Sequence, residues 1–309
     1  MIFFKILALA LMATTFALPA AADEKLNVVA SFSILGDFAK TIGGEHIQLQ
    51  TIVGPDSDAH VYEPKPSDAI ATAKADIVLV NGLMFEGFLA RLIDASRTSA
   101  IVVEASKGAA LIEDNDEHHH HHHDHDEDAP HMTAFNPHAW HSVGNAKIYV
   151  KNITDAFCKA DEKNCPSYQE NATAYLAKLD ALDLDIRKTI ALIPDNRRVF
   201  VVAHNSFFYF ERNYGVTFLS PSGVSTESEA SAADMANVVR EITDKQAIAI
   251  FAENISNSRL VEQIAAETGL KLGGTLYSDA LSKPDGKAAT YLDMMRSNLA
   301  LISKAAHAL

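Results

Sequence analysis

Residues 167–193 read SYQENATAYLAKLDALDLDIRKTIALI, and they stand between Pro166 and Pro194. Apolar side chains recur in this stretch at spacings of three and four, which is the period of one face of an α-helix. A proline is tolerated in the first turn of a helix and ends one at the other side, so the stretch predicts a single helix of about 40 Å. This helix divides the chain into two halves. Its apolar face comprises Tyr168, Ala172, Tyr175, Leu179, Leu182, Ile186 and Ile190.

On both sides of the helix, short apolar β-branched runs alternate with amphipathic segments. This alternation is typical of a parallel sheet with helices on its faces. We therefore expect an α/β fold of two (β/α)4 lobes, each a mostly parallel sheet with flanking helices, joined by one long backbone helix. The expected strands are 27–32, 47–53, 76–80, 100–104, 198–203, 216–219, 248–252 and 271–275. The expected helices are 34–42, 67–75, 85–95, 206–214, 232–244, 258–268 and 290–306.

The N-terminus has the pattern of a secretory signal peptide. Lys5 precedes an apolar run over 6–18, and small residues at 20–22 offer a cleavage site before Asp23. The run is too short for a membrane span of about 20 residues. No cysteine lies near the cleavage point to accept a lipid. We expect residues 1–22 to be removed and the mature protein to be exported and soluble, without a lipid anchor.

The length of the chain indicates how many lobes it forms, and its net charge indicates which class of partner it binds. About 285 residues remain after cleavage, which is comfortable for two cores of roughly 100 to 150 residues each. The expected division is an N-terminal lobe at 23–150, a disulfide loop and linking helix at 151–193, and a C-terminal lobe at 194–309. The net charge is −14, and no basic stripe is present to bind phosphates, which argues against nucleic acid as a partner. The excess of acidic residues favours cations as partners.

Cys158 and Cys165 are the two cysteines of the chain. In an oxidising compartment such a close pair is expected to form a disulfide, and closing so short a loop contributes roughly 2.5 kcal/mol. A two-cysteine metal site is the rival interpretation. Against it, the spacing is longer than the C-x₂₋₄-C of zinc modules.

Residues 113–131 read EDNDEHHHHHHDHDEDAPH. A segment this polar cannot bury enough apolar surface to offset the entropy lost when it becomes ordered. We therefore expect a flexible loop, and its imidazoles are ligands that suit Zn, Cu or Ni. An inserted purification tag and a merely solvated charge run are the other interpretations. The candidate auxiliary zinc ligands of this histidine tract are His118, His119, His120, His121, His122, His123, His125 and His131.

Four other metal-binding side chains lie downstream of expected strands. In two facing lobes, the carboxyl ends of the strands line a cleft where loops converge and ligands usually bind. Three neutral imidazoles and one carboxylate form a four-coordinate shell suited to Zn²⁺. The four residues are far apart in sequence and share no compact motif, so their spacing alone does not prove a site. They are His60, His138, His204 and Asp279.

Five segments carry a resemblance to a known family: DAHVYEPKPSD at 58–68, NPHAW at 136–140, AHNSFFYFERNYG at 203–215, FAENISNSRLVEQIAAETG at 251–269 and LYSDALS at 276–282. Together with the linking helix and the histidine tract, they resemble the zinc-binding solute-binding proteins of ABC importers. The similarity is to the ZnuA-like members of the cluster A-I class, and to AztC-type members in particular. It covers essentially the whole mature chain.

The resemblance implies two lobes joined by a rigid helix, with a metal ion held between them and delivered to a membrane permease and, indirectly, to its ATPase. It places the first-lobe ligands on His60 and His138 and the second-lobe ligands on His204 and Asp279. Manganese-binding relatives tend to have a carboxylate at the third position, so His204 points to zinc. The resemblance also implies a periplasmic monomer that captures metal and catalyses nothing.

The second motif departs from the family pattern. The family often continues into Leu-Asp-Pro where this chain has His141, Ser142 and Val143, and it often has Asp-Pro where this chain has Asp58 and Ala59. His141 is therefore a reserve ligand. Capping or solvating the helix that starts near Val143 is its favoured role.

Other polar residues are not expected to bind the metal ion directly. Glu63 and Glu227 could reach the site through water, although a solvated glutamate is the simpler interpretation. His46 and His307 are expected to be ordinary surface or helix-end histidines.

We expect the histidine tract to act as an auxiliary zinc acquisition site, supplied by a periplasmic zinc metallochaperone or by free ions. A zinc-dependent hydrolase with a His₃-bound water and an adhesin on the same scaffold are the alternative functions.

Overall fold

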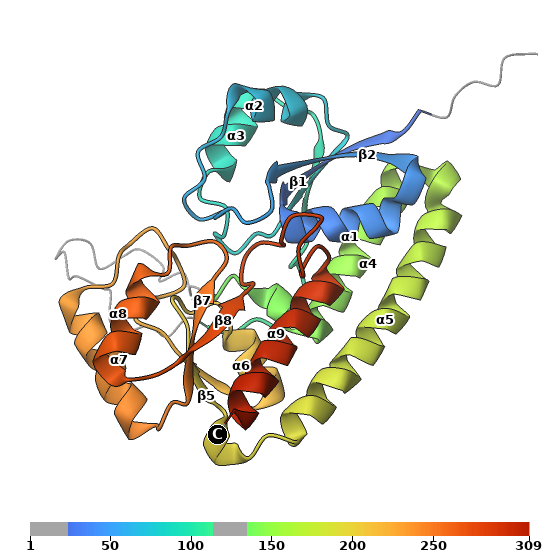
Figure 1. The fold of residues 1–309 in the computed structure, drawn as a ribbon. Helices are drawn as coiled ribbons and strands as arrows, with labels where there is room; N and C mark the ends of the chain where they lie inside the picture. The colour runs from blue at the N-terminus through green and yellow to red at the C-terminus, as the bar shows by residue number, and fades with distance from the viewer. Residues whose placement is uncertain (1–23, 114–134, 309) are drawn as a thin grey trace, which may run out of the picture.

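The computed structural model describes residues 24–113 and 135–308, and it contains two separate parallel sheets (Figure 1). The first sheet has the order β2-β1-β3-β4, and β1 pairs in register with β2 from Leu26 opposite Ile47. Its strands are β1 (Leu26–Phe32), β2 (Ile47–Val53), β3 (Ile77–Val80) and β4 (Ile101–Glu104). Because all are parallel, their carboxyl ends lie along one edge.

The second sheet repeats this topology, with the order β6-β5-β7-β8 and every pairing parallel. The expected fold class is confirmed. The strands are β5 (Val199–Val201), β6 (Thr217–Leu219), β7 (Ala249–Glu253) and β8 (Leu272–Leu276).

Helices follow or separate the strands of both sheets. The first half contains α1 (Ser33–Gly43), α2 (Pro66–Ala73), α3 (Leu89–Ser96) and α4 (Val143–Ala160). The second half contains α6 (Phe208–Tyr214), α7 (Ala232–Asp244), α8 (Arg259–Thr268) and α9 (Tyr291–His307). Short 3₁₀ turns are η1 (Gly44–His46), η2 (Ala139–His141), η3 (Glu162–Asn164) and η4 (Asp195–Arg197).

The long helix α5 (Cys165–Ala191) runs beside both halves of the molecule (Figure 1). The seven apolar residues predicted to form its inner face are the seven that it buries. It begins two residues before the expected start, because Pro166 occupies its first turn, where a missing N–H costs nothing. The disulfide between Cys158 and Cys165 is present and joins the end of α4 to the start of α5.

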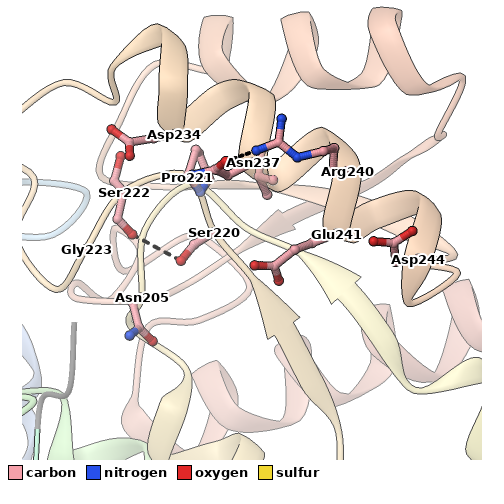
Figure 2. A pocket seen from close by; sticks show the side chains of 11 residues that line it. Asn205, Ser220, Pro221, Ser222, Gly223, Asp234, Asn237, Arg240, Glu241 and Asp244 are labelled. Atoms are coloured by element: carbon pink, nitrogen blue, oxygen red, sulfur yellow. Dashed lines mark hydrogen bonds between the residues drawn. The ribbon is translucent and has the colours of Figure 1, made fainter. Parts of the chain in front are cut away.

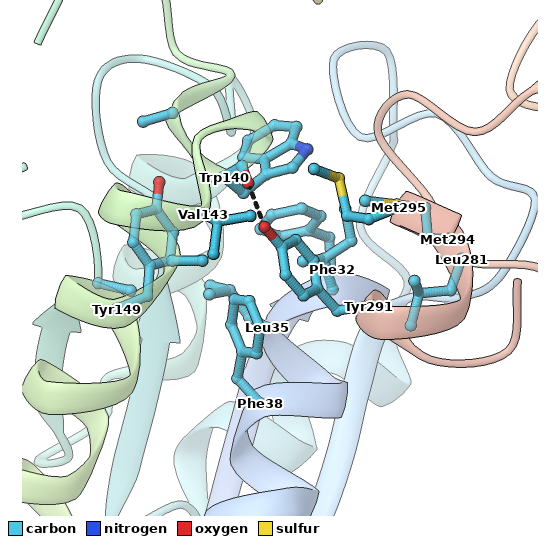
Figure 3. Close-up of a cluster of buried hydrophobic side chains, with 14 of the residues drawn as sticks. Phe32, Leu35, Phe38, Trp140, Val143, Tyr149, Leu281, Tyr291, Met294 and Met295 are labelled. Carbon is cyan, nitrogen blue, oxygen red and sulfur yellow. Dashed lines mark hydrogen bonds between the residues drawn. The ribbon is translucent and has the colours of Figure 1, made fainter. Parts of the chain in front are cut away.

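The main hydrophobic core is continuous across the two halves, which differs from the expectation of two separate cores. In Figure 3, Tyr291 and Met295 of α9 lie beside Phe32 and Trp140 of the first half. The Tyr291 hydroxyl donates to the backbone oxygen of Trp140 at 2.7 Å, and its backbone N–H donates to Asp37 Oδ2 at 2.8 Å. Such shared packing resists rigid-body opening of the lobes. A smaller cluster packs α7 and α8 against the second sheet.

Two segments differ from the sequence predictions. The helix expected at 85–95 begins only at Leu89, because Gly82, Leu83 and Met84 form a left-handed turn before it. The helix expected near Val143 continues to Ala160, so the boundary expected at residue 150 falls inside α4. The domain division at 150 and 193 stays a proposal.

The signal peptide expected at 1–22 and the histidines of the tract lie outside the described residues. Within 24–113 and 135–308, no helix is long and apolar enough to cross a membrane.

Candidate metal centre

The structure brings His60, His138, His204 and Asp279 together between the two sheets. His60 lies between β2 and α2, and His138 lies between β4 and η2. His204 follows β5, and Asp279 follows β8. All four side chains are buried. The carboxyl edges of both sheets face the same place, as the sequence predicted.

The distances between the ligand atoms of the four side chains match the bond lengths of a small metal ion. Nε2 of His138 lies 3.4 Å from Nε2 of His60 and 3.3 Å from Nε2 of His204. Asp279 Oδ2 lies 3.3 Å from Nε2 of His60 and 3.2 Å from Nε2 of His204, and Oδ1 lies 3.4 Å from Nε2 of His138. Four of the six edges of a tetrahedron on the three Nε2 atoms and Asp279 Oδ2 are thus 3.2 to 3.4 Å long. A regular tetrahedron with edges of this length has its centre about 2.0 to 2.1 Å from each corner, which is the usual Zn–N distance.

The tautomers of two ligands are fixed by residues that the sequence analysis did not single out. His138 Nδ1 and its backbone N–H both donate to Asn136 Oδ1, at 2.8 and 3.0 Å. His204 Nδ1 donates to Glu253 Oε2 at 2.6 Å. With Nδ1 engaged in donating, Nε2 is the nitrogen that faces the centre of the cluster and is available to a metal ion. Glu253 lies at the end of β7, which pairs with β5, and this pairing places it beside the segment that carries His204.

The cluster is enclosed by aromatic side chains. Phe85 packs against His60 with ring centroids 4.8 Å apart, and Trp140 packs against His138 at 5.3 Å. The Trp140 indole N–H donates to the backbone oxygen of Ser278, which anchors the loop of Asp279. These walls exclude water, and charge interactions within the cluster are stronger as a result.

Burial and charge shift the ionisation of the cluster in opposite directions. Burial lowers the pKa of His138 to about 4, despite the neighbouring Asp279 carboxylate. Burial alone would also lower the pKa of His204, but the carboxylates of Glu253 and Asp279 raise it well above its usual value. Burial would raise the pKa of Asp279, but His138 and His204 hold it well below its usual range. The two carboxylates therefore favour a proton on His204, and a metal ion competes with that proton for the same nitrogen.

Metal affinity is accordingly expected to fall on acidification. Below the raised pKa of His204 the empty protein holds a proton that the loaded protein does not, so each lower pH unit weakens binding by about tenfold per displaced proton. Competition titrations with a chelator between about pH 7.5 and 5.5 measure this slope. An affinity independent of pH over that range would show that no imidazole proton is displaced.

Replacing Glu253 by glutamine is expected to weaken metal binding about 10- to 100-fold, the usual cost of losing a hydrogen-bond partner of a ligand. Glu253 accepts from three donors, which are His204 Nδ1 and the backbone N–H groups of Ala203 and His204. A glutamine must turn its NH₂ toward one of them. Isothermal titration against Glu63→Gln, an exposed glutamate paired with Arg91, provides the measurement and its control. Equal affinities in the two variants would contradict this role.

The other sequence candidates lie away from the cluster. His141 is not a ligand in this arrangement and does not cap α4, whose N-cap is Ser142. It is fully buried against Phe207, and burial lowers its pKa to about 3, so the expectation that it caps or solvates the start of this helix was wrong. Glu63 and Glu227 are exposed.

His46 and His307 are peripheral, as expected. The ring of His46 lies edge-on to Tyr168, and His307 Nδ1 donates to the backbone oxygen of Ser303.

A surface pocket of about 450 Å³ borders the His204 loop but is not the metal site, because none of the four ligands lines it (Figure 2). Figure 2 shows polar side chains of α7 on one side and Ser220, Ser222 and Asn205 on the other. Asn205 N–H donates to the backbone oxygen of Gly223 at 3.0 Å. The loop after β6 is thereby attached to the segment that carries His204.

Comparison with known proteins identifies relatives of this chain. Residues 28–305 match a family model described as the periplasmic component A of a zinc-uptake complex. The manganese-binding lipoprotein MntA of Bacillus subtilis is 34% identical over 292 residues, covering 92% of this chain and 90% of the relative. The iron-binding protein YfeA of Yersinia pestis is 28% identical, covering 93% and 88%.

Solved structures show the same fold. The periplasmic zinc-binding protein TroA from Treponema pallidum superposes with a TM-score of 0.82 at 29% identity, covering 92% of this chain and 99% of TroA. The manganese-bound periplasmic metal-binding protein from Candidatus Liberibacter asiaticus has a TM-score of 0.79 at 29% identity, covering 92% and 100%.

Proposed function

Because this chain belongs to the family of periplasmic zinc-uptake components, the non-enzymatic metal-binding proteins of ABC importers, we propose that its cargo is zinc. In this proposal His60, His138, His204 and Asp279 capture the ion in the periplasm and the protein delivers it to the membrane permease. Three imidazole nitrogens and one carboxylate suit zinc, whereas manganese prefers more oxygen ligands. The observation that carries the proposal is the spacing of 3.2 to 3.4 Å between the donor atoms.

Manganese is the second candidate cargo. The relative from Bacillus subtilis is named a manganese-binding lipoprotein. Asp279 also turns both of its oxygens toward the histidines, Oδ2 toward His60 and His204 and Oδ1 toward His138. A carboxylate that binds through both oxygens would provide a fifth donor atom, and manganese accepts more oxygen than zinc does.

Affinity alone does not separate the two cargoes, since nearly every site binds zinc more tightly than manganese. The test is uptake of ⁶⁵Zn and ⁵⁴Mn by cells that express the wild type or His204→Glu, with the affinities of both ions measured in parallel. We expect zinc uptake to depend on the wild type, and the zinc-to-manganese affinity ratio to fall by at least about tenfold in His204→Glu. Wild-type-dependent uptake of manganese alone would overturn zinc as the cargo.

The histidine tract is proposed as an auxiliary site on the sequence alone. Its residues collect zinc weakly or receive it from a periplasmic metallochaperone, and they pass it to the four ligands. Deleting 114–128 is then expected to leave the tight site intact. We likewise propose that the protein is soluble, without a lipid anchor, and monomeric.

A further inference from the structure

The four candidate ligands are not equally buried. His60 is 7% exposed, whereas His138 and Asp279 are 0% and His204 is 1% exposed. An ion that reaches or leaves the cluster without unfolding either lobe therefore has its shortest route past His60. The surface around His60 is the part of the molecule from which cargo can pass to another protein.

Three segments surround His60 at this surface. Val61, the next residue, is 51% exposed. A Cβ built on Gly87 would lie 3.8 Å from the backbone oxygen of His60 and 3.5 Å from Glu227 Oε1. The turn before α3 and the loop before α7 therefore meet beside His60. We name Val61, Met84, Gly87 and Glu227 the His60 rim.

The turn that carries Met84 is strained. Gly82, Leu83 and Met84 have φ angles of 83°, 55° and 63° in succession. For the two residues with side chains, a left-handed conformation costs roughly 1 to 2 kcal/mol each. Strain of this kind persists where the surrounding structure enforces it, and it concentrates at functional sites.

The strained turn is held by a buried carboxyl group. Glu86 Oε1 accepts from the backbone N–H of Asn81 at 2.6 Å and from Ser31 Oγ at 2.6 Å, and its Oε2 accepts from the backbone N–H of Gly82 at 3.3 Å. Phe85 then turns inward onto His60, while Met84 turns outward and is 92% exposed. Among the exposed large hydrophobic side chains of the described residues, Met84 has the highest exposure.

We propose that the His60 rim is the surface on which the permease of the ABC importer docks, with Met84 as its apolar anchor. This inference rests on the proposed function. A methionine is unbranched and polarizable, and it adapts to the irregular pockets of a protein partner. Exposed Glu227 lies beside Gly87, three residues after the anchor, so the complementary permease surface is an apolar socket with a basic side chain beside it. Docking there seals the route past His60 from bulk water.

The test replaces Met84 by aspartate and compares it with Leu192→Asp. Leu192 is 75% exposed but precedes β5, so it lies at the amino edge of the second sheet, away from the metal centre. For each variant we measure metal affinity, thermal unfolding and uptake of the ion, zinc or manganese, whose transport depends on the wild type. Met84→Asp is expected to keep wild-type affinity and to reduce uptake at least about tenfold by placing an unpaired charge in the socket. Leu192→Asp is expected to keep both.

The outcomes separate this inference from the proposed function. A wild type that binds no metal at the four ligands overturns the function itself. Uptake by Met84→Asp at the wild-type rate, or an equal loss in Leu192→Asp, overturns the docking surface. A loss of metal affinity in Met84→Asp also overturns it, because the turn would then serve only the site. Should Met84→Asp unfold, Met84→Ala takes its place, with a smaller expected loss of uptake.

Discussion

Replacing His138 by alanine is expected to weaken metal binding by about a hundredfold to a thousandfold. Nε2 of His138 lies 3.3 to 3.4 Å from donor atoms of all three other candidate ligands, so it contacts every other member of the cluster. Four-ligand structural zinc sites bind with roughly 10 to 16 kcal/mol, which is about 2.5 to 4 kcal/mol per ligand. A loss of that size corresponds to the expected change in affinity.

The measurement is a competition titration with a chromophoric chelator, accompanied by circular dichroism to show that the variant is folded. His307→Ala is the matched control, because His307 is exposed and bonds only to the backbone oxygen of Ser303. Wild-type affinity in folded His138→Ala would remove His138 from the site. An equal loss in His307→Ala would show that binding is not localised.

Replacing Trp140 by alanine is expected to destabilise the metal-free protein by about 3 to 5 kcal/mol, the usual range for a fully buried aromatic side chain. Trp140 is fully buried and packs against Phe32 and Phe85, with ring centroids 5.1 and 4.9 Å away. The substitution also removes the indole hydrogen bond to the backbone oxygen of Ser278. One side chain thus links the core of the first half to the loop of Asp279.

Urea unfolding of the metal-free variants measures this effect, and an unchanged m-value would show that the change is one of stability. Trp140→Phe, which keeps an aromatic ring but not the indole N–H, is expected to lose less than half as much. A loss below about 1 kcal/mol in Trp140→Ala would mean that the site collapses around the cavity and that the lobes are not joined through this residue.

The regular elements were predictable because their patterns are local. The seven apolar positions of α5 could be read from their spacing, and the bounds of β2 and α7 match the predictions for 47–53 and 232–244. The start of α3 could not be predicted in the same way. The left-handed turn before it depends on the buried Glu86 carboxyl, which accepts from backbone groups there and from Ser31 on another strand.

Topology indicated that the four candidate ligands would gather, because each lies downstream of a parallel strand, but the resemblance to the zinc-binding family selected them. Their supporting residues were not predictable, because Asn136 and Glu253 act through contacts that only the folded chain creates. The burial of His141 could not be predicted for the same reason. Its burial is set by Phe207, which comes from the second half of the chain.

The shared core was also hidden in the sequence. Segment lengths suggested two cores, yet α9 packs its Tyr291 onto Phe38 of α1, with ring centroids 4.9 Å apart. A contact between residues so far apart along the chain leaves no periodic signal. Its consequence is mechanical: the lobes share buried side chains, so loading is expected to move loops more than lobes.

Anomalous diffraction at the zinc edge, from crystals of the loaded full-length protein, tests the central claim most directly. The account predicts a peak about 2.0 to 2.2 Å from Nε2 of His60, His138 and His204 and from a carboxylate oxygen of Asp279. A crystal with zinc bound elsewhere and no peak among these four side chains would contradict it.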